Sequence, residues 1–220
     1  HRLFTYLFAF AENLVSSTLP PKSKLNLAKL AFADHLLDVR TRLVTKTLAA
    51  ASAAKAIDVY SGVLYQALDW GSLSATAKAR GDKSLLIISA IFGVLRPSDV
   101  IPNYKAKIKS SDWKVALKPA LDGLEADLII DCRSSTYAGV WQSPPDRTVA
   151  VRVFKKEKGK ISVITHLSKK YRGELTRELL KSGKSPKTPA ELLAIAEKHF
   201  ECKLIKAKGN LPWYLDLIIS

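Results

Sequence analysis

Three cations stand close together where a helix is expected to begin. An amphipathic pattern predicts a helix over 168–182, so Lys169, Lys170 and Arg172 fall near its start. Cations at that end oppose the helix dipole, and a bound anion would relieve the cost because backbone N–H groups and side chains then share one phosphate. We therefore expect phosphate contacts from these three residues. The alternative is a solvated helix face with ion pairs between residues three positions apart.

A second candidate for phosphate binding is the segment 92–97 (FGVLRP). A hydrophobic–Gly–hydrophobic turn is what a helix–hairpin–helix motif uses, because glycine lets backbone amides approach a phosphate. Phe92 and Gly93 would form the turn, and Arg96 would add a bidentate donor. The same pattern fits a core turn in which Arg96 pairs with Asp99 or Asp131.

A polar cluster follows a buried strand predicted over 126–132. In α/β sheets, ligands bind at the carboxyl ends of strands, so these side chains could form a small pocket. The candidate pocket residues are Tyr60, Asp131, Arg133, Ser134, Tyr137 and His166. Nothing around Ser134 resembles a nucleophile elbow, so we expect no Ser-His-Asp triad and assign no catalytic residue. A structural, hydrogen-bonded His166 is the alternative.

The charge balance predicts a polyanionic partner. The 220 residues carry 35 Lys and Arg against 20 Asp and Glu, a net charge of +15 and a pI near 9.8. A field of that sign attracts nucleic acid most often. Eleven basic and three acidic residues fall within 155–187 alone. The tryptophans are scattered outside this run, which favours a grip on the DNA backbone over a stacking platform for single strands.

The remaining composition narrows the class further. Cys132 and Cys202 fit no metal spacing, and two buried thiols in a reducing cytosol are expected. No apolar run approaches the ~20 residues of a membrane span, so we expect no membrane partner. We also expect a cytoplasmic protein that holds no metal and no cofactor. The segment 3–10 (LFTYLFAF) is predicted to be a buried strand and not a signal peptide. The chain contains no methionine, and we expect its N-terminal segment to be incomplete.

Helices and strands alternate without a fixed period, which predicts one α/β domain over residues 1–220, with a mixed sheet flanked by helices. Further strands are predicted over 85–89, 148–154, 161–167, 202–206 and 214–219. Further helices are predicted within 25–57 (two segments, broken near 45–51) and over 59–68, 73–80, 114–124 and 189–200. Gly81 is expected to close the helix over 73–80.

With these segments in view, the chain resembles the YaaA family of bacterial peroxide-stress proteins. The matching segments are 58–62 (DVYSG), 89–97 (SAIFGVLRP), Asp99, Pro102, Tyr104, Trp113, 131–137 (DCRSSTY) and 165–173 (THLSKKYRG). The resemblance implies a mixed α/β domain of unusual topology, a positively charged cleft and a helix–hairpin–helix-like element. It also implies binding to duplex and branched DNA, protection from hydrogen peroxide, lower free iron and recombinational repair.

Two hypotheses about function follow. The first is a DNA-binding protein of the oxidative-stress response, which contacts the sugar-phosphate backbone with little base readout. The second is an enzyme that acts on a nucleotide or nucleic-acid component in the pocket around Asp131 and Arg133. A direct role in iron handling ranks last, because no His/Asp/Glu cluster has ligand spacing.

Overall fold

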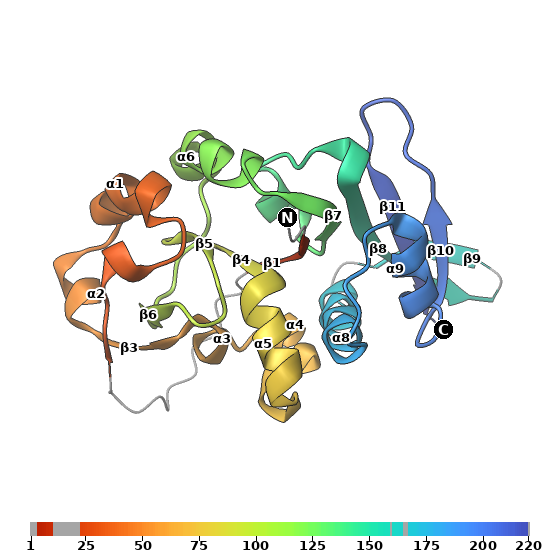
Figure 1. Ribbon diagram of the computed structural model, residues 1–220, viewed down its shortest axis with the longest axis horizontal. Coiled ribbons are helices and arrows are strands. Elements are labelled where there is room, and N and C mark those ends of the chain that lie inside the picture. The colour runs from red at the N-terminus through yellow and green to blue at the C-terminus, as the bar shows by residue number, and fades with distance from the viewer. Residues whose placement is uncertain (1–3, 11–22, 159, 165–166, 220) are drawn as a thin grey trace.

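The computed structural model describes residues 4–10, 23–158, 160–164 and 167–219 (Figure 1). A mixed β-sheet runs through the centre with helices packed against it. Its strands are β1 (Phe4–Phe10), β4 (Leu85–Ser89), β5 (Gly93–Leu95), β7 (Ala126–Asp131), β8 (Thr148–Glu157), β9 (Lys160–Val163), β10 (Glu201–Ile205) and β11 (Trp213–Ile219). The α/β class predicted from the sequence is confirmed.

The strands are arranged in the order β10-β11-β8-β7-β1-β4-β5, and β9 pairs with β8 outside this path. Strand β1 lies between β4 and β7 and is parallel to both. Parallel pairing continues from β7 to β8 and from β8 to β11. The outer strands β5, β9 and β10 are antiparallel to their neighbours, so the sheet is mixed.

Helices on one face of the sheet belong to the core that contains Leu86, Ile88 and Ile129. They are α1 (Ala33–Leu43) and α6 (Ser110–Asp122), which contributes Trp113 and Leu117 to this core. We call this side the α6 face. The helix α6 begins at Ser110, four residues before the predicted start, and its Asp112 lies in the first turn, where a carboxylate complements the helix dipole.

The opposite side, the α8 face, carries the larger core and four helices. They are α4 (Val63–Leu68), α5 (Ala75–Ser84), α8 (Ser168–Lys181) and α9 (Pro189–Ala196). Residues that alternate along the strands point into this core, among them Val149, Val151 and Val153 of β8 and Leu215 and Leu217 of β11. Thr188 caps α9, since its Oγ1 accepts a hydrogen bond from the backbone N–H of Glu191, and the Glu191 carboxylate accepts one from the backbone N–H of Lys187.

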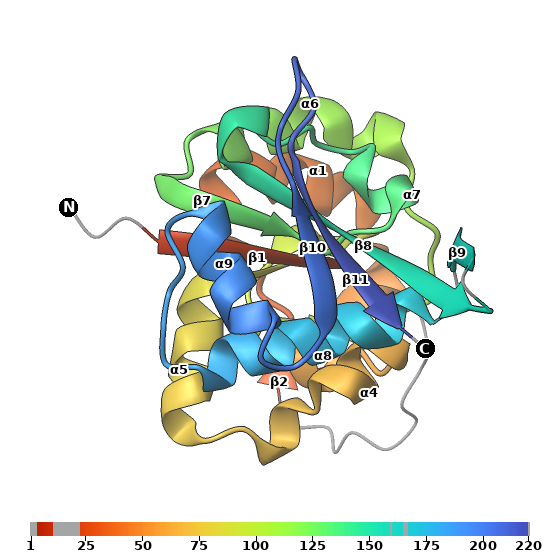
Figure 2. The same cartoon turned by 90° about the vertical axis from the view of Figure 1, so that its right-hand side faces the viewer.

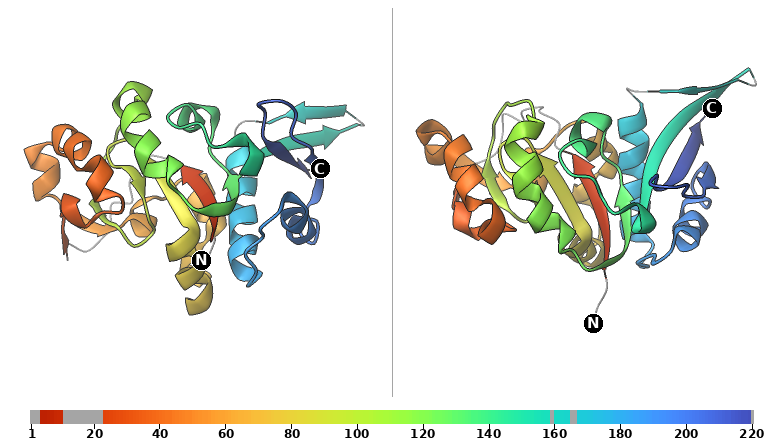
Figure 3. Two further views of the ribbon diagram at one scale, coloured as in Figure 1. Left: turned by 45° about the horizontal axis from the view of Figure 1, so that its top comes forward. Right: turned by 90° about the horizontal axis from the view of Figure 1, so that it is seen from above.

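The two faces are not covered equally. On the α6 face, the core formed by α1 and α6 extends over β4, β5 and β7, and none of its buried members comes from β8, β9, β10 or β11. The described helices that pack on β8 and β10 are α8 and α9, both on the α8 face. Figure 3 shows β8, β9 and β11 standing clear of α1 and α6.

Shorter elements complete the part of the chain that the structure describes. A small antiparallel sheet has the order β2-β3-β6. The shorter elements are β2 (Ser23–Lys24), η1 (Leu27–Lys29), α2 (Lys46–Ala50), β3 (Ser52–Lys55), α3 (Ala56–Val59), η2 (Trp70–Ser72), β6 (Val100–Pro102), α7 (Ser135–Ala138) and η3 (Pro145–Arg147).

Two helix predictions were wrong. The helical pattern over 25–57 breaks at Val44 and Thr45, and residues 52–55 form β3 because they pair with β6. The helix over 73–80 does not end at Gly81 but continues to Ser84. Gly81 is needed there for space: a Cβ atom would lie 2.5 Å from the Trp70 ring.

Candidate functional site

The most elaborate polar arrangement on the sheet lies where β4 ends. Ser89 is the last residue of β4, and its Oγ lies 3.0 Å from the hydroxyl of Tyr60 and 2.6 Å from that of Tyr104. The two phenols are themselves 3.0 Å apart, which closes a triangle of hydroxyl groups. The backbone N–H of Phe92 also donates to Ser89 Oγ. The triangle therefore ties segments around residues 60, 89 and 104 to one strand end.

Two further tyrosines join this group. Tyr65 stacks on Tyr60 with ring centroids 5.4 Å apart, and Tyr137 approaches from the segment after β7. Burial raises the pKa of Tyr60 and Tyr65 well above 10.0, and proximity to Tyr104 raises both further. Burial likewise raises the pKa of Tyr137 to about 12. All of these phenols are neutral at physiological pH, so they serve as hydrogen-bonding groups and not as bases.

The hydroxyl of Tyr65 is buried and has no hydrogen-bond partner among the described residues. The Tyr65 and Tyr60 rings also line a cavity of about 250 Å³, together with Asp58 and Gln66. A buried hydroxyl without a partner costs about 1–3 kcal/mol. A polar ligand group is one way to satisfy it.

Asp131 and Arg133 form a closed ion pair beyond the end of β7. Arg133 Nε donates to Asp131 Oδ1 at 2.9 Å, and Nη2 donates to Oδ2 at 2.7 Å. Arg133 Nη1 donates to the backbone carbonyl of Trp141, and the guanidinium lies 5.4 Å from the Trp141 ring centroid. Both residues are buried, since Asp131 is 8% exposed and Arg133 is 5% exposed. The pair holds the segment after β7 in place, and the Arg133 guanidinium is directed at protein groups.

On the other face of β7, Cys132 and Arg172 lie close together. Burial raises the pKa of the Cys132 thiol to about 12, against a smaller opposite effect of Arg172. Arg172 Nη2 donates to the carbonyl of Val151 at 3.0 Å, and burial lowers the pKa of its guanidinium. Arg172 is therefore part of the packing between α8 and the sheet, which removes it from the predicted surface cluster.

The FGVLRP segment has a different role from the one predicted. Gly93 has φ +73° and opens β5, which pairs with β4, so the turn joins two antiparallel strands and not two helices. The helix–hairpin–helix placement is wrong for these residues. Phe92 is fully buried, and Arg40, also fully buried, donates to the carbonyls of Phe92 and Val94. Burial lowers the pKa of Arg40 to about 10.

Arg96 fixes the end of β5 to a neighbouring helix. Its Nη1 donates to the carbonyls of Asp82 and Lys83 at the end of α5. Asp99 accepts from the backbone N–H of Arg96 at 2.8 Å and from that of Ala31 at 3.0 Å. The predicted alternative of a core turn describes this arrangement better than a phosphate-binding turn does. The Arg96 guanidinium, which was predicted there to pair with a carboxylate, donates to backbone carbonyls.

The exposed cations gather on the hairpin of β8 and β9 and at the start of α8. Lys156, Lys158, Lys160 and Lys170 are exposed, and Lys169 is half-buried. Figure 2 shows the hairpin projecting from the sheet next to one end of α8. Among the residues that the structure describes, the first turn of α8 contains no acidic residue, and its N-cap residue Leu167 makes no side-chain capping hydrogen bond. This group of five lysines is called the hairpin–α8 surface below.

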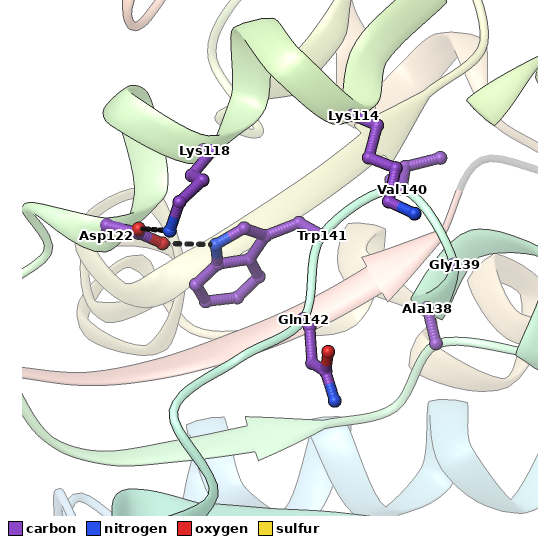
Figure 4. Close-up of a pocket in the computed structure, with 8 residues that line it drawn as sticks. All are labelled: Lys114, Lys118, Asp122, Ala138, Gly139, Val140, Trp141 and Gln142. Atoms are coloured by element: carbon purple, nitrogen blue, oxygen red, sulfur yellow. Dashed lines mark hydrogen bonds and ion pairs between the residues drawn. The ribbon is translucent and has the colours of Figure 1, made fainter. Parts of the chain in front are cut away.

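A larger cavity of about 620 Å³ lies on the α6 face between α6 and the segment after α7 (Figure 4). Lys114 and Lys118 reach toward it from α6, and Trp141 forms a wall. Trp141 Nε1 donates to Asp122 Oδ1 at 2.8 Å, and Lys118 is hydrogen-bonded to the other oxygen of Asp122. Lysines, an aromatic wall and the amide of Gln142 would suit a small anionic ligand.

The structure thus separates the predicted site residues into distinct places. Gly93 begins β5, with Phe92 just before this strand and Arg96 just after it, at the edge of the main sheet path opposite to β10, while Lys169 and Lys170 lie in the first turn of α8. Among the predicted pocket residues, Tyr60 and Tyr137 meet in the tyrosine group, Asp131 and Arg133 pair with each other, and Ser134 is the N-cap residue of α7. His166 lies outside the described residues.

Several residues of this site carry no strong signal in the sequence. Ser89 and Tyr65 stand in apolar segments that predict only a strand and a helix. Arg40 lies on an amphipathic helix, where a basic residue ordinarily faces solvent. Tyr60, Tyr104 and Tyr137, which lie at positions that match the family, were the available indication that the tyrosines mattered.

Two features are absent from the described residues. No group of three or more His, Cys, Asp or Glu residues is placed there to hold a metal ion. No described helix has both the length and the apolar character needed to cross a bilayer.

The fold and the strand-end site define an α/β protein with a central mixed sheet, a buried tyrosine group and a basic surface. A comparison with family models matches residues 11–204 to the peroxide stress protein YaaA. The chain therefore belongs to the YaaA family, and the resemblance drawn from its motifs is confirmed.

Curated relatives include UPF0246 proteins and an uncharacterized protein. A UPF0246 protein of Streptomyces coelicolor is 35% identical over 187 residues, which cover 78% of this chain and 71% of that protein. A UPF0246 protein of Corynebacterium glutamicum is 36% identical over 155 residues, 64% of this chain and 61% of its own length. An uncharacterized protein of Campylobacter jejuni is 32% identical over 164 residues, 70% of this chain and 64% of that protein.

Proposed function

We propose that this member of the peroxide-stress family binds duplex or branched DNA in the cytoplasm, through contacts with the sugar-phosphate backbone. The observation that supports it most is the hairpin–α8 surface, where lysines crowd a helix start that has neither an acidic residue nor a side-chain cap. Phosphate groups bind helix starts because lysine side chains and backbone N–H groups can act on the same oxygen atoms. The net charge of +15 would increase the rate of encounter with DNA.

The proposal now rests on fewer residues than the sequence suggested. Arg172 is packed against Val151, and Arg96 is bonded to carbonyls of α5. Lys169 and Lys170 remain as the phosphate contacts at the helix start, and the lysines of the hairpin tip extend them. Lys170 lies 3.6 Å from Glu174, an exposed ion pair that a phosphate can replace at little cost.

The test is a charge reversal with a matched control. Lys169→Glu/Lys170→Glu should abolish binding of a fluorescent duplex in an anisotropy titration, and the protein should keep its circular dichroism spectrum. Lys29→Glu/Lys83→Glu makes the same change of charge at exposed positions of η1 and α5 and should retain most of the affinity. The wild-type affinity should fall linearly with salt on a double-logarithmic plot. Unchanged affinity in the first variant would rule out the assignment of this surface.

A second candidate is an enzyme that acts on a nucleotide or nucleic-acid component. One observation favours it, namely the unsatisfied Tyr65 hydroxyl beside the cavity that Tyr60 also lines. The ion pair between Asp131 and Arg133 argues against a ligand pocket formed by these two residues after β7, because each side chain is occupied by the other. Isothermal titration with mononucleotides distinguishes the two proposed functions. Binding that is lost in Tyr65→Phe would support the enzyme hypothesis, and an absence of heat would exclude it.

A further inference from the structure

Four neighbouring strands leave one side of the sheet without a helix over it. On the α6 face, Arg152 and Phe154 of β8 alternate with the valines that point into the α8-face core. The register places Val163 of β9 opposite Phe154, and Tyr214 of β11 opposite Ala150. The register therefore places these residues on one side of the sheet, and the ribbons of α1 and α6 lie away from this part of it (Figure 3). We call it the open face.

The centre of the open face is an arginine held flat against two aromatic rings. The Arg152 guanidinium carbon lies 4.1 Å from the Tyr214 ring centroid and 5.4 Å from that of Phe154. Its Nε and Nη2 donate to the two carboxylate oxygens of Asp216, at 2.6 and 2.8 Å. The Arg152 side chain is still 40% exposed. Phe154 and Tyr214 are half-buried, so part of each ring is accessible beside the guanidinium, which its contacts hold in place with little freedom left to lose on binding.

Apolar side chains extend the open face along the projecting hairpin. Ile161 is 57% exposed and Val163 is 71% exposed, both on the edge strand β9. Proteins ordinarily protect edge strands with charge and avoid exposed β-branched pairs, which are sites of association. Here lysines surround the pair, since Lys156 lies opposite Ile161 in the register and Lys160 precedes it.

The charges on and around the open face indicate what would cover it. Asp216 is neutralised by Arg152, and Glu201 lies 3.4 Å from Lys156. Lys203 of β10 and the lysines of the hairpin tip then leave the surface positive. A positive rim around half-buried aromatic rings suits a polyanion that also has flat apolar groups.

We propose that the open face binds an unpaired stretch of DNA, with bases stacked on Phe154, Tyr214 and the Arg152 guanidinium and with phosphates directed toward the hairpin lysines. This inference rests on the proposed DNA-binding function and adds its substrate class, namely DNA with single-stranded segments. Bases of single strands stack on aromatic rings and on arginine planes of open sheets, whereas bases in a duplex are not accessible to them. The open face and the hairpin–α8 surface meet at the hairpin, because Lys156 of β8 belongs to both.

The experiment compares an oligothymidylate with a duplex of equal length in anisotropy titrations. Phe154→Leu/Tyr214→Leu should bind the single strand about 5- to 100-fold more weakly, as expected for lost stacking, and should bind the duplex as the wild type does. Phe32→Leu is the control, because Phe32 also carries an arginine, Arg96, at 5.9 Å but lies on a different part of the fold. It should leave both affinities unchanged.

A second pair of variants avoids any effect on folding. Val163→Glu places a negative charge at a highly exposed position of the open face and should weaken single-strand binding about tenfold or more. Val115→Glu makes the same change at a valine of α6 that is 83% exposed, and it should have no effect. An oligonucleotide with 2-aminopurine should show a change in fluorescence when its base stacks, and this change should disappear in Phe154→Leu/Tyr214→Leu.

Three results would overturn the inference. In the first, the wild type and both open-face variants bind the single strand with the same affinity. In the second, the wild type binds only duplex. The third is sedimentation that shows a wild-type dimer and a monomeric Val163→Glu variant, which would assign the open face to a second copy. Failure of the proposed function is distinguishable, because Lys169→Glu/Lys170→Glu would then leave duplex binding intact whatever the open-face variants do.

Discussion

Gly173 offers the sharpest test of how α8 is held in place. This glycine of the KKYRG segment lies where α8 crosses α4 at close range, and a Cβ atom there would stand 2.2 Å from the carbonyl oxygen of Leu64 and 2.9 Å from Ala67 Cβ. The nearest atom belongs to the backbone, so it cannot rotate away. We predict that Gly173→Ala forces the two helices apart and destabilises the protein.

The magnitude follows from two opposed effects. Overpacking of this kind costs about 1–3 kcal/mol, and a contact with backbone belongs at the upper end, about 3 kcal/mol. Alanine in a helix interior returns about 1 kcal/mol relative to glycine. The net loss in the free energy of unfolding is then about 2 kcal/mol. For a chain of this size, that lowers the melting temperature by about 4–8 °C.

Thermal unfolding followed by circular dichroism measures this change. Gly71→Ala is the matched control, because a Cβ atom at Gly71 would meet nothing within 4 Å. It should shift the free energy of unfolding by no more than ~0.5 kcal/mol. A Gly173→Ala protein as stable as the wild type, or more stable, would refute the close contact between α4 and α8.

Three further predictions concern buried polar groups. Arg133→Leu leaves Asp131 charged and unpaired at a buried site and should lower the free energy of unfolding, measured by urea denaturation, by about 3–5 kcal/mol. Asp131→Asn/Arg133→Leu should recover much of this loss. Equal losses in the two variants would contradict the pairing. Because burial raises the pKa of Tyr60 and Tyr104 above 10.0, their neutral forms stabilise the fold fully below pH 10, and this contribution is lost as the pH rises through the raised pKa values. Phenolate absorbance at alkaline pH should therefore show these tyrosines ionising only with unfolding, and early ionisation would disprove their burial. The Cys132 thiol, whose pKa burial raises to about 12, should react with a disulfide reagent only after denaturation, and rapid reaction in the native state would count against its placement.

Much of the fold could be predicted from periodicity because the relevant signals are local. The signals for the strand over 85–89, for the helix that begins at 189 and for the helix over 168–181 each depend on a few adjacent residues. Residues 52–55 were assigned to a helix because alanine favours one, yet pairing with β6 makes them a strand. There, pairing with a strand almost fifty residues away outweighs the intrinsic helix propensity of alanine.

The site was harder to predict, for a similar reason. Arg96 and Arg172 look like surface cations in a linear pattern, but carbonyl groups from distant elements bind both. The tryptophans argued against a stacking surface, and the arginine between Phe154 and Tyr214 was missed because those rings are sixty positions apart in the chain. Only the pairing of β8 with β11 brings them together.

The central position of β1 has a consequence for biosynthesis. Leu7 pairs with Leu85, and Phe8 pairs with Asp131, so this apolar strand leaves the ribosome long before either neighbour exists. At a translation rate of ~5–20 residues per second, the wait for β4 is roughly 4 to 16 s, and the wait for β7 is longer. During that interval the nascent chain carries an unpaired FTYLFAF segment, which a chaperone would have to shield from aggregation.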